Sequence, residues 1–426
     1  MNHSSIPRIA VLVDLPRGPQ AGGHVKFWER IAAAAARSQL PFDLTVYFSG
    51  GEDSGKLAPH VRLRQLPPVF STARLKFLQD IPDHTDLARH HARLAKELQD
   101  YDVLHATDGF FAFARTAESV SRRCHIPLIT SFHTDTPSYA RIFTRRLIER
   151  NCAAGWLRRA LLDKWNVPER QQCRMIARLG RHLGHCRHAL AARGEDRQLA
   201  EGILGAARVH RLRLGIDRTL FMPRRRDRSA FEAMYRIDPG SIILLFVGRL
   251  DIGKNIYVLI EAVEHLLRQG LPLHLIAAGQ GPARDDIVRR LGRHASAPGF
   301  VPPEDLARLY TEADLLALPS EVEICSMAAV EALASGSPVF VTEKSGIAPI
   351  FDAAPAIKIV PDGVHGWVDA LRLFAADPTQ RDAMRKAAEQ YGDARLASWS
   401  DVLEQDIFPV WQKAHAGKAR KLCSAA

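Results

Sequence analysis

Short apolar runs alternate with longer amphipathic segments along the first half of the chain. The apolar runs have the length and continuity of buried strands, whereas the longer segments repeat their apolar residues at helical spacing. The strand-like runs are 9–15, 42–48, 102–106, 126–131 and 208–214, and the helix-like segments are 25–37, 87–98 and 113–120. Because strands that alternate with helices form a mostly parallel sheet covered by helices, the first half predicts a doubly wound domain.

The alternation begins again at residue 242, after a polar, Pro-containing stretch at 222–228 that is typical of a linker. Strand-like runs cover 242–247, 273–278, 299–301 and 314–319, and the helix-like segments are 255–268, 284–292 and 304–311. The sequence therefore predicts an α/β protein with two Rossmann-like, doubly wound domains, residues 1–222 and 223–398. Since ligands bind beyond the carboxyl ends of the strands in such sheets, we expect the two domains to face an interdomain cleft.

The C-terminal residues 399–426 contain one more helical pattern, and we expect this helix to cross back to the first domain. Its apolar residues recur every four positions, at Trp399, Leu403, Ile407 and Trp411. No uncharged apolar run approaches the ~18 residues that a membrane span needs. Asp14 interrupts the first apolar run, which therefore predicts a strand and not a signal peptide. These features lead us to expect a cytoplasmic location.

The composition is typical of a globular protein, with 46% hydrophobic and 25% charged residues among 426. The six cysteines are scattered without a C-x-x-C pair, which favours reduced thiols and predicts no redox or zinc pair. Five possible ligands lie close in sequence, at Cys173, His182, His185, Cys186 and His188. Their irregular spacing among arginines argues against a metal site, so we expect no metal.

Positive charge is concentrated in one part of the chain. The net charge is +11, and residues 141–228 alone hold 22 Lys and Arg against eight Asp and Glu. Such a segment should contact an anionic partner, such as a membrane surface, a phosphorylated substrate or a nucleic acid. Residues 140–165 mix arginines with bulky apolar side chains, so a helix here could lie on an anionic bilayer. A core helix with solvated arginines is the alternative, and both interpretations stay open.

Two carboxylates flank a predicted turn between a strand and a helix. Glu323 and Glu331 lie eight positions apart, and the small residues 327–334 predict a helix that Ser326 caps and Gly336 ends. The unpaired N–H groups and the dipole at the start of that helix favour a phosphate. Hydrogen-bond acceptors on both sides of a phosphate site suit a nucleotide sugar, which carries hydroxyls on both sides of its phosphates. Solvated surface acids are the alternative.

Further candidates follow other predicted strands. Arg249 and Lys254 come directly after one strand and can neutralise a diphosphate, although solvated loop cations show the same pattern. Gly22 and Gly23 open the first helix, where the lack of side chains lets a ligand approach, unless the turn is an ordinary flexible one. His133 ends another strand, where functional side chains gather, but a single histidine is more often structural.

Together these residues resemble the retaining family-4 glycosyltransferases of GT-B fold, and the resemblance covers nearly the whole chain. Its most specific part is the E-x7-E pair within Glu-Ala-Leu-Ala-Ser-Gly-Ser-Pro and the residues before it. The matching positions are Gly22, Gly23, His133, Asp217, Phe221, Arg249, Lys254, Gly279, Pro282, Ser320, Glu323 and Glu331. The resemblance implies transfer of a sugar from a nucleotide-diphosphate donor, a UDP- or GDP-sugar, to an acceptor hydroxyl. It also implies retention at the anomeric carbon and no obligatory cofactor or metal.

By the same resemblance, most candidates belong to the donor site. These are Arg249 and Lys254 for the departing diphosphate, Glu331 for the ribose, Glu323 for the donor sugar, Cys325 and Ser326 for the diphosphate through their backbone, and Val301 at the base. The others are His133 near the reacting sugar and the pair Gly22 and Gly23, which make room at the cleft. We expect a glycan or lipid-linked acceptor, in glycolipid or envelope or capsular polysaccharide synthesis. Peripheral attachment to the inner face of the cytoplasmic membrane is also expected.

The chain departs from the family pattern at two places, one of them after Ser345-Gly346-Ile347, where a family-typical acid is absent and Pro349 stands nearby. Cys325 and Ser326 stand where the family usually has Phe-Gly, and the additional side chain changes the surroundings of the diphosphate. Among the alternative functions, a sugar-nucleotide epimerase or a glycan phosphorylase of GT-B type is the nearer one. A nicotinamide dehydrogenase lacks support, because Pro282 directly follows the glycine turn where its fingerprint would continue. Nucleic-acid binding through residues 141–228 is more distant, since that segment has no recognition module, and we expect no nucleic-acid partner.

Overall fold

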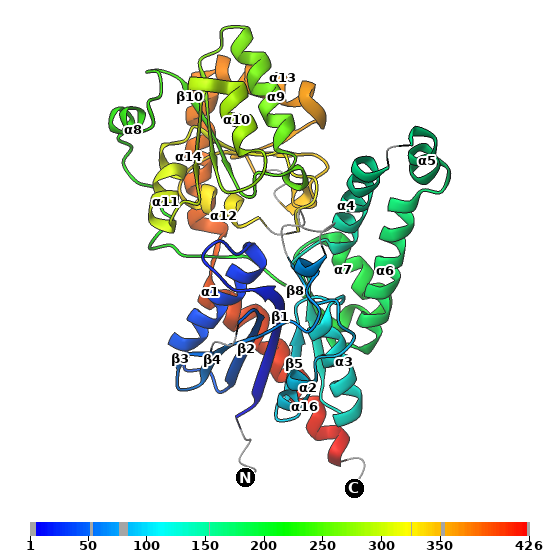
Figure 1. Cartoon of the computed structure of the whole chain (residues 1–426). Coiled ribbons are helices and arrows are strands. Elements are labelled where there is room, and N and C mark those ends of the chain that lie inside the picture. The colour runs from blue at the N-terminus through cyan, green and yellow to red at the C-terminus, as the bar shows by residue number, and fades with distance from the viewer. Residues whose placement is uncertain are drawn as a thin grey trace. The chain divides into compact units, whose positions relative to one another are not determined.

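The chain divides into two compact units, each with its own α/β sheet (Figure 1). Unit 1 is Met1–Arg213 together with Trp399–Ala426, and unit 2 is Leu214–Ser398. The computed structural model describes residues 6–51, 54–75, 84–152, 154–324, 326–350 and 354–423.

The sheet of unit 1 has the strand order β3-β4-β2-β1-β5-β6-β7-β8. Its strands are β1 (Arg8–Pro16), β2 (Asp43–Ser49), β3 (Ser54–Ala58), β4 (Val61–Leu66), β5 (Val103–Ala106), β6 (Leu128–Ser131), β7 (His188–Ala191) and β8 (Val209–Arg211). All neighbours are parallel except β3 and β4, which form an antiparallel hairpin. The sequence did not predict this hairpin, because β3 reads Ser-Gly-Lys-Leu-Ala and lacks an apolar run.

Helices connect the strands of unit 1 and flank its sheet (Figure 1). They are α1 (Gly23–Arg37), α2 (Ala92–Leu98), α3 (Ala112–Cys124), α4 (Thr136–Asn151), α5 (Gly155–Arg159), α6 (Val167–His185) and α7 (Gly194–Leu204). The C-terminal segment continues through α15 (Trp399–Asp401), a π-helical turn η8 (Val402–Ile407) and α16 (Phe408–Cys423). It buries the four apolar side chains of the predicted pattern and contacts β5 and β6. No helix in the described ranges is both long and apolar enough to cross a bilayer.

The sheet of unit 2 is fully parallel, in the order β12-β11-β10-β13-β14-β15. Its strands are β10 (Ile242–Val247), β11 (Leu273–Ala278), β12 (Ala295–Gly299), β13 (Leu315–Leu318), β14 (Val339–Thr342) and β15 (Ile357–Val360), and β9 (Gly215–Ile216) pairs separately with β16 (Ala397–Ser398). Its helices are α8 (Arg228–Tyr235), η5 (Ile252–Lys254), α9 (Ile256–Arg268), α10 (Arg284–Leu291), α11 (Pro303–Glu312), α12 (Met327–Ala334), α13 (Gly363–Ala376) and α14 (Pro378–Arg395).

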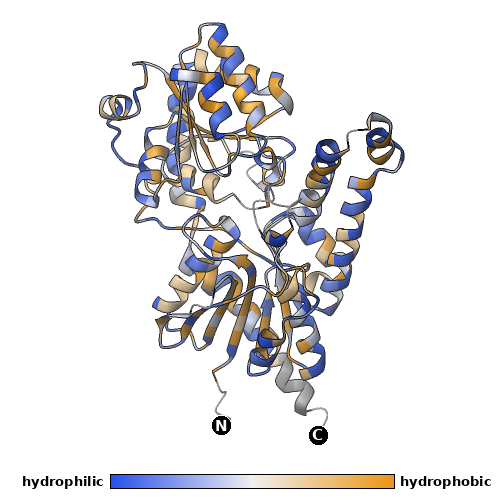
Figure 2. Cartoon of the chain, in the orientation of Figure 1, coloured by the Kyte–Doolittle hydropathy of each residue, from blue (hydrophilic) through white to orange (hydrophobic). Residues whose placement is uncertain are grey.

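Strand β10 shows why the strands of this sheet read as continuous apolar runs. Ile243 and Leu245 belong to one buried cluster, while Leu244 and Phe246 belong to the cluster on the other face. Successive side chains of a strand point to opposite faces, and here helices cover both of them. Apolar residues therefore occupy every position of β10, and Figure 2 shows hydrophobic segments in strands of both sheets.

The stretch 222–228, expected as a free linker, is instead tied to the sheet of unit 2. Arg226 and Arg228 both donate to the carboxylate of Asp314, at 2.9 and 3.0 Å. Asp314 also accepts from the backbone N–H of Ile243 at 2.8 Å. Burial alone would raise the pKa of Asp314, but the two arginines hold it below its usual value. These arginines are therefore structural and do not belong to a basic binding surface.

The chain order reverses beside the first strand of each sheet. In unit 1 the strands proceed from β1 to β2 on one side and from β5 to β8 on the other. In unit 2 they proceed from β10 to β12 on one side and from β13 to β15 on the other. At the carboxyl ends of the strands, the loop after β1 therefore diverges from the loop after β5. The loop after β10 likewise diverges from the loop after β13. Open α/β sheets bind ligands at such points.

Candidate functional site

In unit 2 the loops after β10 and β13 meet through one ion pair. Lys254 Nζ lies 2.5 Å from Glu323 Oε1. A second bond joins the same loops, because Asn255 Nδ2 donates to the carbonyl oxygen of Pro319 at 3.2 Å. Glu323 is only 9% exposed, so its charge is compensated mainly inside the protein. Two of the predicted donor-site residues thus come together at the point where the strand order reverses.

Arg249 lies on the loop that also carries Lys254. Its Nε lies 3.4 Å from Asp251 Oδ2. Asp251 in turn caps the short helix η5, since its Oδ1 accepts from the backbone N–H of Lys254 at 3.0 Å. One buried carboxylate therefore holds the geometry of the loop and steadies both cations. Two positive side chains on one ordered loop are suited to a diphosphate.

Helix α12 begins where the sequence predicted it. Ser326 is its N-cap, because Oγ accepts from the backbone N–H of Ala329 at 3.3 Å. Glu331 lies inside the helix and accepts a hydrogen bond at 3.0 Å from the hydroxyl of Tyr310, a fully buried residue of α11. Burial and the charge of Glu331 raise the pKa of Tyr310 well above its usual value. Cys325, expected to help hold the diphosphate, lies outside the described residues.

The glycine turn after β11 supports the loop that carries Arg249. A Cβ on Gly279 would lie 1.8 Å from the carbonyl oxygen of Gly248, and one on Gly281 would lie 2.3 Å from that of Leu250. Both glycines also have positive φ, at 151° and 153°. The close approach of these two loops therefore requires glycine at both positions, whether or not a ligand contacts the turn.

Val301 follows a different strand of unit 2 from the loops that carry Lys254 and Glu323. It follows β12, the edge strand, which β11 separates from β10. Its side chain is partly buried and packs on the hydrophobic core. The position is compatible with a place at the margin of a site along the carboxyl edge, and its assignment to the base of the donor site stays a prediction.

In unit 1 the glycine pair opens helix α1 directly after β1. Gly22 is the N-cap residue, with an ordinary φ of −67°. No heavy atom outside its immediate neighbours lies within 4 Å of the place where its Cβ would be. Neither backbone conformation nor packing thus demands glycine at this position. Gly23 is the first residue of the helix, and His24 follows it within the first turn.

His133 follows β6 and packs against this first turn of α1. Its ring stacks on that of His24, with centroids 4.6 Å apart and planes inclined by 10°. Its Nε2 accepts from the indole N–H of Trp28 at 3.2 Å and lies 2.8 Å from Ser131 Oγ. Burial lowers the pKa of His133 well below its usual value, and the neighbouring histidines add to the effect. The structure therefore brings His133 and the glycine turn together.

Several polar residues near the candidates were not predicted from the sequence. His24 directly follows the glycine pair, and His105 is the polar residue inside the apolar strand β5. The sequence position of each could therefore have marked it as a candidate. Tyr310 looked like an ordinary core residue of an amphipathic helix. Its hydroxyl acquires a role only because α11 and α12 place it against Glu331.

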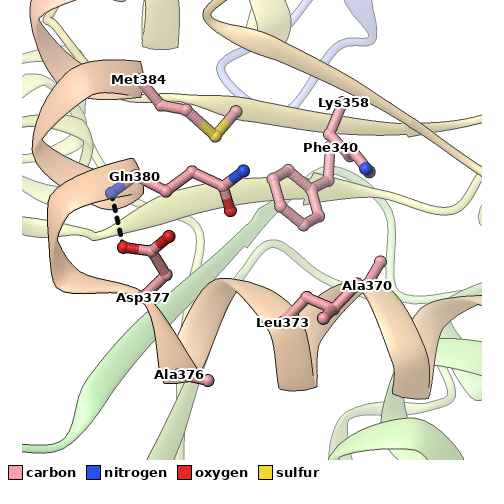
Figure 3. A pocket seen from close by; sticks show the side chains of 8 residues that line it. All are labelled: Phe340, Lys358, Ala370, Leu373, Ala376, Asp377, Gln380 and Met384. Carbon is pink, nitrogen blue, oxygen red and sulfur yellow. Dashed lines mark hydrogen bonds between the residues drawn. The ribbon is translucent and has the colours of Figure 1, made fainter.

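A pocket of about 250 Å³ lies elsewhere in unit 2. It is lined by Phe340, Lys358, Ala370, Leu373, Ala376, Asp377, Gln380 and Met384 (Figure 3). Helix α13 starts beyond the carboxyl end of β15 and runs back along the sheet, so its last residues and the N-cap Asp377 of α14 lie toward the opposite edge. Figure 3 shows Asp377 bonded to the backbone N–H of Gln380, at 2.9 Å. The pocket contains none of the candidate residues.

In the cluster of cysteine and histidine near the end of α6, His182, Cys186 and His188 are buried, whereas Cys173 and His185 are exposed. His182 Nδ1 lies 2.5 Å from Glu118 Oε1, and its Nε2 lies 3.2 Å from Thr130 Oγ1. The thiol of Cys186 bonds to the carbonyl oxygen of His182 at 3.3 Å. Among the described residues, no group of three or more His, Cys, Asp or Glu side chains is arranged to hold a metal ion.

Known proteins with similar sequences include several glycosyltransferases. Residues 227–391 match the family described as Glycosyl transferases group 1. The chain is 26% identical over 320 residues to a sulfoquinovosyl transferase of Arabidopsis thaliana, a stretch that covers 73% of this chain and 57% of that protein. It is 28% identical over 285 residues to a D-inositol 3-phosphate glycosyltransferase of Rhodococcus erythropolis, covering 59% and 63% of the two. The chain thus spans less than two thirds of each relative.

Solved structures with the same architecture match nearly the whole chain. A sucrose-phosphate synthase from Thermosynechococcus elongatus superimposes with a TM-score of 0.69 at 18% identity, over 99% of this chain and 100% of that one. HepE of Anabaena, in complex with UDP-glucose, does so with a TM-score of 0.63 at 15% identity, over 98% and 100%. The predicted fold is therefore confirmed. The chain has the GT-B fold, and its residues 227–391 match the group 1 glycosyltransferases.

Proposed function

We propose that the protein is a retaining glycosyltransferase that moves a sugar from a nucleotide-diphosphate sugar to an acceptor hydroxyl. The observation that supports this most directly is the meeting of Lys254 and Glu323 where the strand order of unit 2 reverses. A cation and an anion on facing loops can bind the two parts of a nucleotide sugar, its diphosphate and its hydroxyls. The complex of the similar structure with UDP-glucose also supports this class of donor.

In this proposal the two cations of the β10 loop stabilise the departing diphosphate. Negative charge grows on the diphosphate as the bond to the sugar breaks, so Arg249 and Lys254 act more strongly in the transition state than in the ground state. Lys254 then shares its charge between the phosphate oxygens and Glu323. Glu331, oriented by Tyr310, accepts hydrogen bonds from the ribose. The start of α12 near Ser326 adds backbone N–H groups for the phosphates.

Retention without a covalent sugar intermediate fits the same residues. A retaining hydrolase sets its nucleophilic carboxylate about 5 Å from its acid. Here Glu323 is paired with Lys254, so its role is to bind sugar hydroxyls as a hydrogen-bond acceptor. The departing phosphate takes the proton of the acceptor hydroxyl on the face of the sugar that it leaves. This step needs neither a metal ion nor a protein nucleophile.

The acceptor is a glycan or a lipid-linked molecule, and the helices α4 to α6 favour a membrane surface. Pro137 is the buried residue of α4, and none is buried in α5, so this segment is no core helix. Trp156 is 70% exposed and Trp165 is 44% exposed, among the arginines of the basic segment. Exposed indole rings beside positive charge suit the interface of an anionic bilayer. Peripheral attachment at the inner face of the cytoplasmic membrane follows.

Liposome co-sedimentation tests the membrane part of the proposal. The protein should bind vesicles that contain about 30% anionic lipid at low salt and should detach as salt screens the attraction. The double variant Trp156→Ser and Trp165→Ser should weaken binding, whereas Leu373→Ser, which removes a 62% exposed apolar side chain from unit 2, should not. Equal binding of neutral and anionic vesicles, or none at low salt, contradicts this part.

A thermal-shift panel of UDP, GDP, ADP and their sugars tests the donor class. A ligand that binds only the folded protein raises its melting temperature, and the base that does so is identified at once. Products formed from the stabilising donor then separate the alternatives. Transfer with retained anomeric configuration supports the proposal, whereas an epimerised donor without transfer supports the epimerase. Phosphate-dependent cleavage of a glycan supports the phosphorylase.

A further inference from the structure

We propose that the indole N–H groups of Trp28 and Trp411 fix the ring tautomers of His133 and His105. His133 then offers only a hydrogen-bond donor, Nδ1–H, and His24 offers the complementary acceptor to the same substrate hydroxyl. The binding of a hydroxyl rests on the proposed function, whereas the tautomers rest on unit 1 alone. In this arrangement His105 and Trp411 are positioning residues, and His24 is a further contact to the substrate.

The tautomer of His133 follows from the chemistry of tryptophan. An indole nitrogen can only donate, so the 3.2 Å bond from Trp28 Nε1 requires an unprotonated Nε2 on His133. The proton of the neutral ring then resides on Nδ1. A second proton on Nε2 would break the bond to Trp28, so the imidazolium form is disfavoured in this site.

A second tryptophan fixes the next ring in the same way. Trp411 Nε1 donates to His105 Nδ1 at 3.1 Å, which leaves the proton of His105 on Nε2. That Nε2 lies 3.0 Å from Ser131 Oγ and donates to it. The hydroxyl of Ser131 is thereby directed to His133 Nε2, 2.8 Å away, where it shares the single lone pair of that nitrogen with the indole N–H of Trp28. The C-terminal helix α16 thus reaches His133 through a chain of bonds with one consistent direction.

His24 has the opposite arrangement. Thr107 donates its hydroxyl proton to the carbonyl oxygen of Leu12 at 2.9 Å. Its oxygen can therefore only accept from His24 Nε2, 2.8 Å away, and this places the proton of His24 on Nε2. The Nδ1 atom of His24 keeps its lone pair. No bond from either Nδ1 atom, that of His24 or that of His133, is found among the residues that the structure describes.

The stacked rings therefore present one donor and one acceptor beside the glycine turn. Both residues are partly exposed, and their rings are nearly parallel with centroids 4.6 Å apart. A sugar hydroxyl can accept one hydrogen bond and donate another, which matches this pair, whereas a carboxylate or phosphate oxygen cannot donate to His24. No proton is transferred in this contact. The pair binds and orients a hydroxyl, and His133 is no general base.

Nitrogen-15 spectra of the full-length protein labelled at histidine test the tautomers directly. His24→Gln, His105→Gln and His133→Gln assign the signals. We expect His133 as the Nδ1–H form and His24 and His105 as the Nε2–H form at pH 7. Trp28→Phe should give mixed tautomers at His133 and Trp411→Phe at His105. Trp399→Phe, a buried tryptophan that packs on Phe27, is the matched control and should change neither.

The same spectra test the contact to the substrate. UDP-glucose, GDP-mannose or ADP-glucose, whichever raises the melting temperature, should shift Nδ1 of both His24 and His133, and the matching nucleoside diphosphate should not. An Nε2–H form or an imidazolium at His133 overturns the tautomer assignment. Binding of the sugar nucleotide without a shift at either Nδ1 overturns the hydroxyl contact. Failure of all three donors to bind contradicts the proposed function, while the tautomer assignment is still decided by the spectra.

Discussion

Lys254 and Glu323 form an ion pair across 69 residues of sequence, with Nζ 2.5 Å from Oε1. The pair closes the gap between the loops after β10 and β13, where the strand order of unit 2 reverses. A loop lysine without such a partner would sample many rotamers before it met a ligand. Here its ordering has already occurred in the folded protein, so less conformational entropy is lost on binding.

We expect Lys254→Ala to lower kcat/KM at least ~100-fold, because it removes a charge-assisted contact to the departing diphosphate. It also removes the ion-pair partner of Glu323, so stability should be measured beside activity. Arg372→Ala is the control, since it removes an exposed cation paired with Asp369 on α13. Wild-type kinetics in Lys254→Ala, with the donor that stabilises the protein, would refute the assignment of this residue.

Glu331→Ala should likewise lower kcat/KM at least ~100-fold, mainly through a higher KM for the donor, because a carboxylate that holds the ribose is lost. Tyr310→Phe keeps the carboxylate and removes only the hydroxyl bound to it at 3.0 Å. A neutral hydrogen bond is worth about 1 kcal/mol, so this variant should lose roughly fivefold. A larger loss in Tyr310→Phe than in Glu331→Ala would show that Glu331 does not bind the donor.

The parallel sheets were predictable because their strands are buried on both faces. Runs such as β10 contain apolar residues throughout. Such a strand can be recognised in the sequence without knowing which strands pair with it. The hairpin of β3 and β4 escaped prediction because β3 is short and polar and gains its stability from pairing. The stretch 222–228 has the composition of a linker, yet two of its arginines bind Asp314, which lies 86 or more residues away in sequence.

In the candidate site, too, local sequence patterns predict some residues but not the partners that the fold brings to them. Glu323 and Glu331 could be selected from their spacing around a turn, and Ser326 from its place before a helix. Their partners Lys254 and Tyr310 depend on which strands and helices become neighbours in the fold. Buried histidines and tryptophans are frequent in cores, so no local pattern distinguishes a residue such as His105 from ordinary packing.

Two glycine substitutions should distinguish a glycine that the packing of the protein requires from one that leaves room for a substrate. Gly22→Ala places its Cβ in open space at an ordinary φ, so the free energy of unfolding should change by less than about 0.5 kcal/mol. Its activity should nevertheless fall if a substrate approaches this turn closely. Gly279→Ala places its Cβ 1.8 Å from the carbonyl oxygen of Gly248 and should cost about 2–4 kcal/mol.

Urea denaturation and donor kinetics of both variants check this prediction, and Gly18→Ala is the control. A Cβ on Gly18 also meets no atom within 4 Å. Gly18 belongs neither to the glycine pair proposed to lie near a substrate nor to the close approach of Gly279 and Gly248. If Gly22→Ala and Gly18→Ala have equal activity, the glycine pair has no special place in substrate binding. An unchanged stability of Gly279→Ala would show that the two loops can separate without loss.

Acid should destabilise unit 1 through two histidines that the fold keeps neutral, the partly exposed His24 and the buried His105. Burial lowers the pKa of both His24 and His105 to about 3, whereas each should titrate near 6.5 in the unfolded chain. The unfolded chain therefore binds more protons between these values, and stability falls as pH falls below 6.5. Each histidine contributes at most about 1.4 kcal/mol per pH unit. His105→Phe should flatten the decline between pH 6.5 and 5, measured by urea denaturation, and an unchanged slope contradicts the prediction.

Alkali should weaken the same unit through His182, whose shift has the opposite sign. Burial alone would lower the pKa of His182, but its charge interactions and hydrogen bonds with Cys186 and Glu118 raise it to about 10. The stabilisation from this charged histidine is complete below pH 6.5 and disappears as pH rises through 10, because the unfolded chain has by then already released its proton.

Five of the six tryptophans belong to unit 1, so intrinsic fluorescence during urea denaturation reports mainly on its unfolding. The free energy of unfolding of the wild type should decline between pH 7 and 9.5, and His182→Gln should lower it at pH 7 and remove most of that decline. His265→Gln is the control, since His265 is a histidine of unit 2 that bonds to Gln269 on the protein surface. An equal decline in all three proteins would show that the pair of His182 and Glu118 carries no charge-dependent stability.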